Sequence, residues 1–427
     1  MRTRLLCVLA LSLALMVPLL GGNRALAQEA PTLQAQDFVA VCGDSITEQK
    51  LYSLYIADYM LMCQPAANMR VMQAGWGGEV AHGFLPRMER DVLALHPTAV
   101  TTCYGMNDGG YGPFDPGRGK LYRDTHQAIV QGLRKAGVRL IVIGSPGVVD
   151  SNTFRGGGQP AEVYNATLAK FGDLGKEVAT EEKVTFADVH GVMMDVMAKA
   201  KAKYGPTYAF AGGDGVHPGP NGHLVMAYAF LKALGCKGEV GTITLDLAAN
   251  KAEATDGHKV LACANGAVDL ESTRYPFCFF GDPASPNATR GIIEFFPFND
   301  DLNRFRLVVK GADAAKKYKV TWGAGSKEFT GEALGQGINL AAEFLDNPFC
   351  APFQKAEQAI RQQQEYETGL TKTILHLLPI YRDVAPEENA ALDRIAAKAI
   401  ARDQALATAS SAAIQPVQHT VKVEVVP

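Results

Sequence analysis

Residues 38–47 read FVAVCGDSIT, five apolar residues followed by a Gly-Asp-Ser turn. The apolar part, Phe38–Cys42, is continuous rather than alternating, which is typical of a strand covered on both faces in a parallel sheet. Ser45 stands where such a strand would turn into a helix. In open α/β sheets ligands bind beyond the carboxyl ends of the strands, so this turn is a candidate site for chemistry.

The same pattern of a short apolar run and a helical segment repeats as far as about Gly235. Further strands are predicted at Arg70–Gln73, Ala99–Tyr104, Leu140–Ile143 and Val184–Val189. Helices are predicted at Leu51–Cys63, His82–Leu95, Leu121–Ala136, Ala161–Ala179, Val192–Lys203 and Asn221–Leu234. Strands that alternate with helices across short connections predict an α/β fold with a doubly wound parallel sheet. We place this α/β domain at residues 36–236.

The pattern changes after Gly235. Alternating runs at 242–247, 305–310 and 318–322 indicate strands, and Pro352–Leu378 and Pro386–Leu406 are helical in pattern. The chain ends in another alternating run, Thr420–Val425. We therefore predict a smaller β domain at residues 240–427. A pair of helices, at about 345–408, is inserted into it, and the final strand returns to the sheet.

Composition and charge narrow the class of protein. Hydrophobic residues make up 47% of the 427 residues and charged residues 20%, which is a globular composition with enough apolar side chain for a large core. Lys and Arg number 41 against 44 Asp and Glu, a net charge of −3. This balance argues against nucleic acid as a partner.

The first residues have the layout of a secretory signal peptide. Arg2 and Arg4 precede an apolar run, Leu5–Leu20, and Ala25-Leu26-Ala27 is a small-residue cleavage site. We predict a signal peptide at residues 1–27, although an uncleaved N-terminal anchor is an alternative. The run is short for a membrane span, and no later stretch is long and apolar enough to be one. The mature protein is expected to be secreted or periplasmic, without a transmembrane segment.

Cysteine usage is less decisive. Seven cysteines follow the predicted signal peptide, and an odd, sparse set is not a disulfide framework. A Cys263–Cys278 bridge stays open at this point. The sequence has no CxxC or HExxH spacing, so we expect no metal site and no cofactor.

Four short blocks stand at the ends of predicted strands or before the last helix of the α/β half. They are Gly43–Thr47, Gln73–Glu79, Gly105–Asp108 and Asp214–His217. Each block alone is matched as well by an ordinary turn or helix cap. All four in this order, each near the carboxyl edge of the sheet, are much harder to explain by coincidence.

Together the blocks hold the groups that acyl transfer needs. Ser45 would attack the carbonyl carbon, and His217 would take the serine proton as general base. Asp214, three residues before His217, would fix the tautomer of the imidazole and stabilise the imidazolium. The backbone N–H groups of Ser45 and Gly78, with the side chain of Asn107, would form the oxyanion hole.

Some roles have more than one candidate. Asp150 and Asp188, near the ends of the fourth and fifth predicted strands, are alternatives for the acid of the triad. Asp214 is preferred because its spacing permits a local contact with the histidine. Trp76, Tyr104 and Tyr111 are aromatic residues near the blocks and are candidates for binding the substrate.

The blocks resemble those of the SGNH (GDSL) hydrolase family, whose four invariant residues would fall on Ser45, Gly78, Asn107 and His217. The resemblance covers Phe38 to Gly235, about half of the chain. It implies a flavodoxin-like sheet and ester hydrolysis with the roles given above. One departure is Gln73, because the family commonly has Asn there to brace the loop. The sequence is also similar to extracytoplasmic bacterial members with an added C-terminal domain.

We therefore predict a secreted serine esterase that hydrolyses short-chain esters, acetyl esters above all. Its partner would be a small-molecule ester or a carbohydrate ester. An alternative is an acyltransferase that passes the acyl group to a polysaccharide from the same acyl-enzyme. A third hypothesis is a non-catalytic carbohydrate-binding or envelope protein built on the same scaffold. The oligomeric state is left open.

Overall fold

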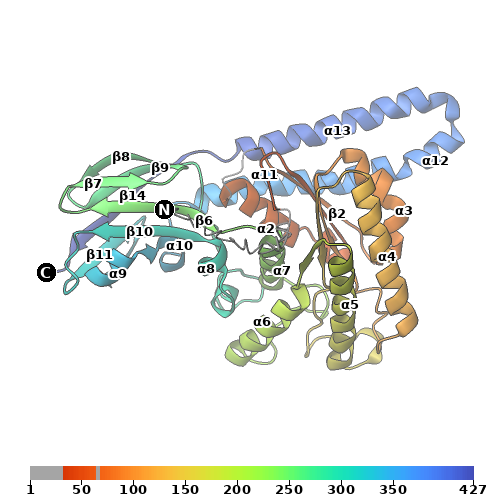
Figure 1. The fold of residues 1–427 in the computed structure, drawn as a ribbon, viewed down its shortest axis with the longest axis horizontal. Helices are drawn as coiled ribbons and strands as arrows, with labels where there is room; N and C mark the ends of the chain where they lie inside the picture. Colours follow the sequence, from red (N-terminus) through yellow and green to blue (C-terminus); the bar gives the residue numbers. More distant parts are fainter. Residues whose placement is uncertain (1–31, 64–67) are drawn as a thin grey trace, which may run out of the picture. The chain divides into compact units, whose positions relative to one another are not determined.

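The α/β half of the chain is built on one parallel sheet. The computed structural model describes residues 32–63 and 68–427, so the predicted signal peptide at 1–27 lies outside the described residues. Sheet A has the strand order β2-β1-β3-β4-β5 (Figure 1). Its strands are β1 Phe38–Gly43, β2 Arg70–Gly75, β3 Ala99–Cys103, β4 Leu140–Gly144 and β5 Thr185–Ala187. The order reverses between β1 and β3, which places a crevice at their carboxyl ends.

Both faces of sheet A are buried. In β1, Val39 and Val41 belong to one hydrophobic core, and the alternating Phe38, Ala40 and Cys42 belong to the other. The first core includes residues of helices α2 (Tyr52–Asp58), α6 (Val189–Tyr204) and α7 (Pro220–Ala233), and it continues into the C-terminal half. The second is built mainly with α3 (Ala81–Asp91), α4 (Pro116–Lys135) and α5 (Ala161–Glu181). The predicted doubly wound α/β fold is confirmed.

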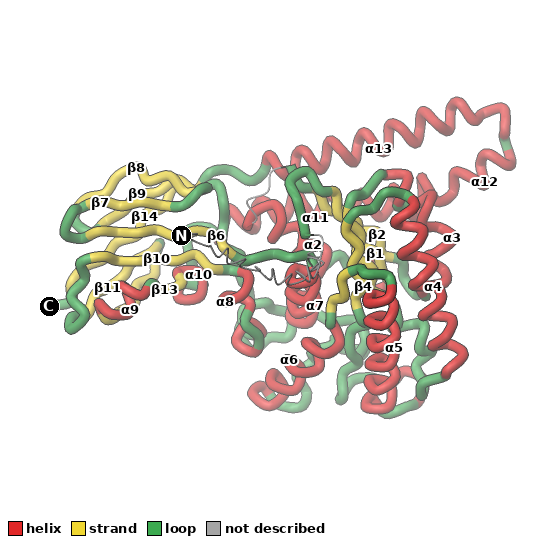
Figure 2. The backbone as a smooth tube through the Cα atoms, in the orientation of Figure 1, coloured by secondary structure: helices red, strands yellow, loops and turns green. Residues whose placement is uncertain are grey.

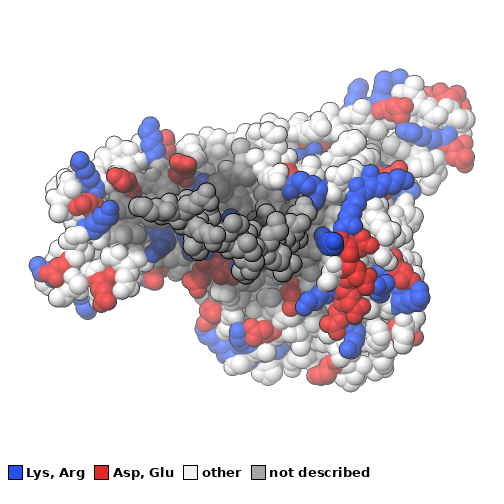
Figure 3. Space-filling model, in the orientation of Figure 1, with Lys and Arg blue, Asp and Glu red and all other residues white. Residues whose placement is uncertain are grey.

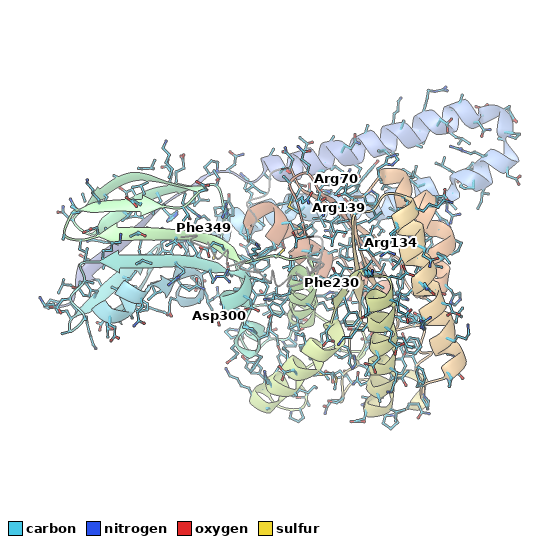
Figure 4. The ribbon with its side chains drawn as sticks, viewed as in Figure 1. Arg70, Arg134, Arg139, Phe230, Asp300 and Phe349 are labelled. Carbon is cyan, nitrogen blue, oxygen red and sulfur yellow. The ribbon has the colours of Figure 1, made fainter. Side chains whose placement is uncertain are left out.

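Phe230 of α7 shows how closely a helix packs on the sheet (Figure 4). Its ring centre lies 5.5 Å from that of Tyr52, and a Cβ on Gly144 of β4 would come within 2.5 Å of the Phe230 ring. A side chain at Gly144 would therefore push α7 away from the strand.

One strand is shorter than predicted. The sequence suggested Val184–Val189, but β5 ends at Ala187 because α6 begins at Val189. The carboxylate of Asp188 accepts a hydrogen bond from the N–H of Gly191 (2.9 Å) and so caps that helix.

The C-terminal half contains two sheets. Sheet B has the order β13-β10-β6-β7 and sheet C the order β12-β11-β14-β9-β8. The strands of sheet B are β6 Glu239–Asp246, β7 Lys251–Ala254, β10 Arg304–Lys310 and β13 Ile338–Asn339. Those of sheet C are β8 His258–Ala264, β9 Ala267–Ser272, β11 Lys317–Trp322, β12 Gly325–Thr330 and β14 Val417–Val425. The last strand does return, and it pairs antiparallel with both β11 and β9. The limits of the two predicted domains stay a prediction.

A helical hairpin separates β13 from β14. It comprises α11 (Cys350–Gly369), a π-helical segment at Leu370–Leu375, α12 (His376–Val384) and α13 (Asn389–Ala412). Helices α11 and α13 lie side by side (Figure 2). The Tyr366 hydroxyl donates to the carbonyl oxygen of Ala399 (3.0 Å), and the Ser410 hydroxyl to that of Ala359 (3.1 Å), so the helices run antiparallel.

Short elements complete the description. Three short α-helices, α8 Phe298–Leu302, α9 Gly331–Gln336 and α10 Leu340–Glu343, lie in the C-terminal half.

Charges of both signs are interspersed over α4 and α5 (Figure 3), where Arg123 pairs with Glu181 and Arg134 with Glu182. Within residues 32–63 and 68–427, none of the helices has both the length and the apolar character that a bilayer crossing requires.

Cys42, Cys63, Cys103, Cys263, Cys278 and Cys350 are free thiols. Cys263 and Cys278 are not bridged, so the option left open by the sequence is not realised. The thiol of Cys278 instead hydrogen-bonds Cys350, and this contact lowers the pKa of Cys350 to about 7 although burial opposes the shift.

A buried chain of hydrogen bonds joins sheets B and C. Trp322 Nε1–H donates to His419 Nδ1 (3.1 Å), so the proton of His419 lies on Nε2 and is donated to the Ser272 hydroxyl (2.9 Å). That hydroxyl donates to His258 Nδ1 (2.8 Å), and His258 Nε2–H donates to the carbonyl oxygen of Val240 (3.0 Å). Each donor has an acceptor only if both histidines are neutral. Burial, followed by the charge of His258, lowers the pKa of His419 to about 4.

This chain predicts a specific loss of stability in acid. An unfolded chain takes up a proton on His419 near pH 6.5, whereas the folded chain resists it until about pH 4, so stability falls as the pH drops through that window. Between pH 7 and pH 5 the loss from this one group is about 2 kcal/mol. Glutamine does not titrate, so we expect the free energy of unfolding of His419→Gln protein to fall less between pH 7 and pH 5. Urea unfolding at the two pH values measures both proteins. An equal loss in both proteins would contradict the assignment.

Candidate active site

Three of the predicted residues meet at the carboxyl edge of sheet A. The Ser45 hydroxyl lies 2.7 Å from Nε2 of His217, although the two are 172 residues apart in the chain. Nδ1 of the same ring lies 2.7 Å from Oδ2 of Asp214. A carboxylate can only accept, so the ring proton is on Nδ1 and Nε2 is left to accept the Ser45 proton. Both contacts are short enough for direct proton transfer.

The sequence between Asp214 and His217 explains their local contact. Asp214 Oδ1 accepts the backbone N–H groups of Val216 (2.9 Å) and His217 (3.0 Å), which folds the segment into a tight turn. Gly215 has φ +78°, and a Cβ there would come within 2.3 Å of the Phe154 backbone nitrogen. A glycine is therefore required at this turn on both conformational and packing grounds.

Asp214 stays ionised in this environment. Partial burial raises its pKa, but hydrogen bonds from the N–H groups of His217 and Val216 and from the His217 ring outweigh burial, and the net pKa is lowered. The side chains of Asp214 and His217 are 56% and 34% exposed, so the pair opens to solvent.

Ser45 is the first residue of a short helix, α1 (Ser45–Glu48). Asp44 caps this helix, because its Oδ1 accepts the N–H of Ile46 (3.0 Å). The Asp44 carboxyl is buried, and burial above all, with the charges of Asp108 and Glu79, raises its pKa to about 7. The N–H of Ser45 lies in the first turn of α1, where backbone donors have no partner within the helix.

The two other predicted oxyanion donors lie on neighbouring loops. Gly78 is exposed and has φ +74°, a conformation that suits glycine. Asn107 Nδ2 donates to the carbonyl oxygen of Glu79 (2.9 Å), and its Oδ1 accepts from the Tyr111 hydroxyl (2.9 Å). An amide nitrogen carries two protons, so the bond to Glu79 leaves one for a substrate oxygen.

Glu79 anchors the loop that carries Gly78. Its carboxylate accepts two hydrogen bonds from Arg87, both 2.6 Å, and one from the Tyr104 hydroxyl (2.7 Å). Tyr104 is only 1% exposed. A phenol this deeply buried cannot touch a substrate, so the prediction that Tyr104 binds it is corrected. Tyr104 supports Glu79 instead.

The other two aromatic candidates lie nearer to solvent. Tyr111 orients Asn107 through its hydroxyl and stacks on Tyr164 with ring centres 5.1 Å apart. Trp76 is partly exposed and lines a pocket of about 400 Å³ together with Gly78. Contact of either ring with a substrate stays a prediction.

Neither alternative acid contacts His217. Asp150 is buried and accepts from Lys201 (2.9 Å) and from the backbone N–H of Phe210 (3.0 Å). Asp188 caps α6, as described above. Of the three carboxylates considered, Asp214 is the one in hydrogen-bonding contact with the imidazole.

Sequence reasoning missed a group of residues around this site. Glu48 accepts the N–H of Gly77 (2.6 Å), and Lys372 and His376 reach the same loop from the helical hairpin. Lys372 and His376 are about 300 positions away from Trp76 in the chain. No local sequence pattern predicts a contact over that separation. Gln73, which replaces the commoner Asn, accepts the N–H of Gly75 and so braces the loop in its own way.

The role of Asn107 can be tested by removing its side chain. We expect Asn107→Ala to lower kcat for an ester about 100- to 1000-fold, because one donor to the developing oxyanion is lost. Tyr111→Phe is the matched control, since it keeps Asn107 but removes the hydroxyl that orients it, and its loss should be smaller. Steady-state kinetics on p-nitrophenyl acetate measure both. Equal kcat for Asn107→Ala and the unmodified protein would remove Asn107 from the oxyanion hole.

Comparison with known proteins agrees with this geometry. Residues 41–225 match the model of the GDSL-like lipase/acylhydrolase family. An acetylxylan esterase from Geobacillus stearothermophilus is 27% identical over 190 residues, which are 43% of this chain and 80% of that enzyme. A gut microbial diltiazem-metabolizing enzyme has the same fold, with a TM-score of 0.72 and 22% identity over 93% of this chain and 99% of its own. Residues 41–225 are a GDSL-like lipase/acylhydrolase domain, and the protein is an ester-hydrolysing serine hydrolase.

Proposed function

We propose that this protein is a secreted esterase that removes acetyl groups from carbohydrates with the triad Ser45, His217 and Asp214. The observation that carries the proposal is the unbroken chain of two 2.7 Å contacts from the serine hydroxyl through the imidazole to the carboxylate. An imidazole held in this tautomer is ready to take the serine proton.

The first half of the reaction would form an acyl-enzyme. Ser45 Oγ attacks the carbonyl carbon while its proton passes to His217 Nε2, and Asp214 stabilises the resulting imidazolium. The carbonyl oxygen becomes an oxyanion and accepts hydrogen bonds from the N–H groups of Ser45 and Gly78 and from Asn107 Nδ2. When the bond to the alcohol breaks, the imidazolium gives its proton to the departing alkoxide.

The second half releases the acid. A water molecule attacks the carbonyl carbon of the acyl-serine, and its proton passes to His217 Nε2. The tetrahedral intermediate collapses, Ser45 recovers its proton from the imidazolium, and acetate leaves. The open setting of His217 and Asp214 supports this step, because water reaches them from the surface.

Two observations favour an acetyl ester on a carbohydrate. The acetylxylan esterase relative shares 27% identity with the α/β half of this chain. The partly exposed Ser45 and His217 lie at the surface rather than in a deep tunnel, which suits an ester on a large, hydrated polymer better than one on a long acyl chain. Secretion rests on the residue pattern of positions 1–27.

The test is release of acetate from acetylated xylan. We expect acetate to appear in step with loss of the polymer's acetyl groups. Longer p-nitrophenyl esters, such as the palmitate, should turn over poorly compared with the acetate. A preference for long-chain esters would contradict the substrate class. Transfer of acetyl from p-nitrophenyl acetate to added polysaccharide, as the main product, would favour the acyltransferase alternative.

A further inference from the structure

The helical hairpin of the C-terminal half covers the open edge of sheet A. Strand β2 is the edge strand, and its backbone groups would otherwise be left without partners. The N–H of Gln73 donates to Glu367 Oε2 (2.9 Å), and the carbonyl oxygen of Val71 accepts from Gln363 Nε2 (3.2 Å). Side chains of α11 thus take the place of a neighbouring strand.

The same helix holds the loop that follows β2. Gln73 Nε2 donates to the Thr368 hydroxyl (3.0 Å), while its Oε1 accepts the N–H of Gly75. This pair of contacts links α11 to the beginning of the 75–79 loop, which ends at Gly78 and Glu79. The hairpin therefore acts on the loop that holds a predicted oxyanion donor.

Lys372 reaches the loop by a second path. Its ammonium group pairs with Glu48 Oε1, and the other oxygen of Glu48 accepts the N–H of Gly77 (2.6 Å). Lys372 Nζ also lies 4.8 Å from the centre of the Trp76 ring. Lys372 and Glu48 are 26% and 27% exposed, so solvent screens the pair less than a fully exposed one. The carboxylate that Lys372 holds is the acceptor that fixes Gly77, the residue before Gly78.

His376 of α12 lies beside Trp76 of the 75–79 loop. Its ring centre is 4.6 Å from that of Trp76, and its Nδ1 lies 2.8 Å from both Asp91 Oδ2 and Arg90 Nη2. It lines the pocket of about 400 Å³ that also includes Trp76, Gly78 and Arg90. Gly78, the predicted oxyanion donor, belongs to that pocket, so the pocket adjoins the predicted oxyanion hole.

The charges around this pocket are paired. Arg87 binds Glu79, Arg90 binds Asp91 (2.9 Å), and Lys372 binds Glu48. Because these charges are paired, the pocket presents hydrogen-bonding groups but little net charge to a ligand. A lining of this kind suits a neutral ligand rich in hydroxyl groups better than a carboxylate or an alkyl chain.

We propose that the hairpin contributes two residues to the active site. Lys372 is a positioning residue that fixes the Gly77–Gly78 turn through Glu48. His376 forms the wall of a pocket for the neutral sugar that carries the ester. The inference rests on the proposed esterase function and assigns it two further residues.

The role of Lys372 predicts a loss in kcat rather than in KM. With p-nitrophenyl acetate, Lys372→Ala is expected to lower kcat about 10- to 100-fold through displacement of the oxyanion loop. KM should change less than about twofold, and Lys372→Arg should restore most of the rate. Glu48→Gln tests the same path with little change in shape. Because both residues act in one path, Lys372→Ala with Glu48→Gln should be no slower than the slower single variant.

The control for Lys372 is Lys327→Ala, which breaks a comparable ion pair with Glu343 (3.0 Å) in the C-terminal half. Its kinetics should match the unmodified protein. The positioning role is overturned if Lys372→Ala behaves like Lys327→Ala, or if the losses from Lys372→Ala and Glu48→Gln multiply. If the unmodified protein turns over no ester, the proposed function fails instead, so the two failures are distinguishable.

The role of His376 predicts a loss in sugar binding. Acetylated xylo-oligosaccharide is titrated calorimetrically into Ser45→Ala protein, which should bind it without turnover. We expect saturable binding that His376→Ala weakens about tenfold. The absence of saturable binding, or equal affinity with and without His376, would overturn the sugar pocket.

Discussion

Ser45→Ala protein is expected to lose ester turnover by about a million-fold in kcat, while it keeps its fold. The hydroxyl that lies 2.7 Å from His217 Nε2 is the group that would form the acyl-enzyme, and alanine offers no substitute nucleophile. The change removes one oxygen from a partly exposed position, so the melting temperature should move little. The measurement is kcat for p-nitrophenyl acetate beside thermal unfolding.

Ser326→Ala, at an exposed position of β12, is the control and should retain full activity. Turnover by Ser45→Ala protein within tenfold of the unmodified protein would place the nucleophile elsewhere. A large fall in the melting temperature would instead mean that the variant is misfolded.

The second large effect is expected at the histidine. His217→Ala should cost nearly as much as the loss of Ser45, because the serine hydroxyl is a poor nucleophile without a base. Asp214→Asn should cost less, at most about ten thousand-fold, since the imidazole remains and only its tautomer and its charge stabilisation suffer. The exposure of Asp214 favours the smaller end of that range, because solvent supplies part of the stabilisation.

This graded order is the informative result. Rates should fall from the unmodified protein to Asp214→Asn to His217→Ala, measured at one pH on one ester. Asp150→Asn is unsuitable as a control because it would break a buried network, but Asp188→Asn removes only a helix-cap charge and should leave kcat unchanged. A larger loss for Asp188→Asn than for Asp214→Asn would overturn the assignment of the acid.

The α/β half was predictable because its signals are local. Strands β1 and β4 of sheet A are continuous apolar runs, and the strands of this sheet alternate with helices whose apolar residues pack on it. The blocks Gly43–Thr47, Gln73–Glu79 and Gly105–Asp108 fall at strand ends, so their meeting at one edge follows from the parallel topology alone. The Asp214–His217 block instead precedes α7, and its pairing with Ser45 was predicted from the chemical roles of the four blocks taken together.

The C-terminal half was less predictable for physical reasons. Strands β7 (Lys251–Ala254) and β8 (His258–Ala264) have largely exposed faces and little apolar periodicity, so they were not predicted. The division of the strands into two sheets depends on long-range pairing, such as the parallel pair β6–β10, for which no short segment carries a signal.

The contacts of the hairpin with sheet A were not predicted, for a related reason. The polar residues of α11 carry no signal of burial in the sequence, but Glu367 and Gln363 are buried against strand β2. Burial raises the pKa of Glu367 to about 8, a cost that no residue pattern reveals. Tyr104 gave the opposite error, because an aromatic residue at a strand end is equally suited to line a pocket or to support a loop.

Labelling with a fluorophosphonate, followed by peptide mapping, tests most directly whether Ser45 is an activated nucleophile. The phosphorus is attacked by an activated serine, so the reaction reports the serine and its base together without any assumption about the natural ester. We expect one modified peptide, which contains Ser45, and strongly slowed labelling in His217→Ala protein. A folded, unmodified protein that takes up no label, or that carries it on another residue, would contradict the account.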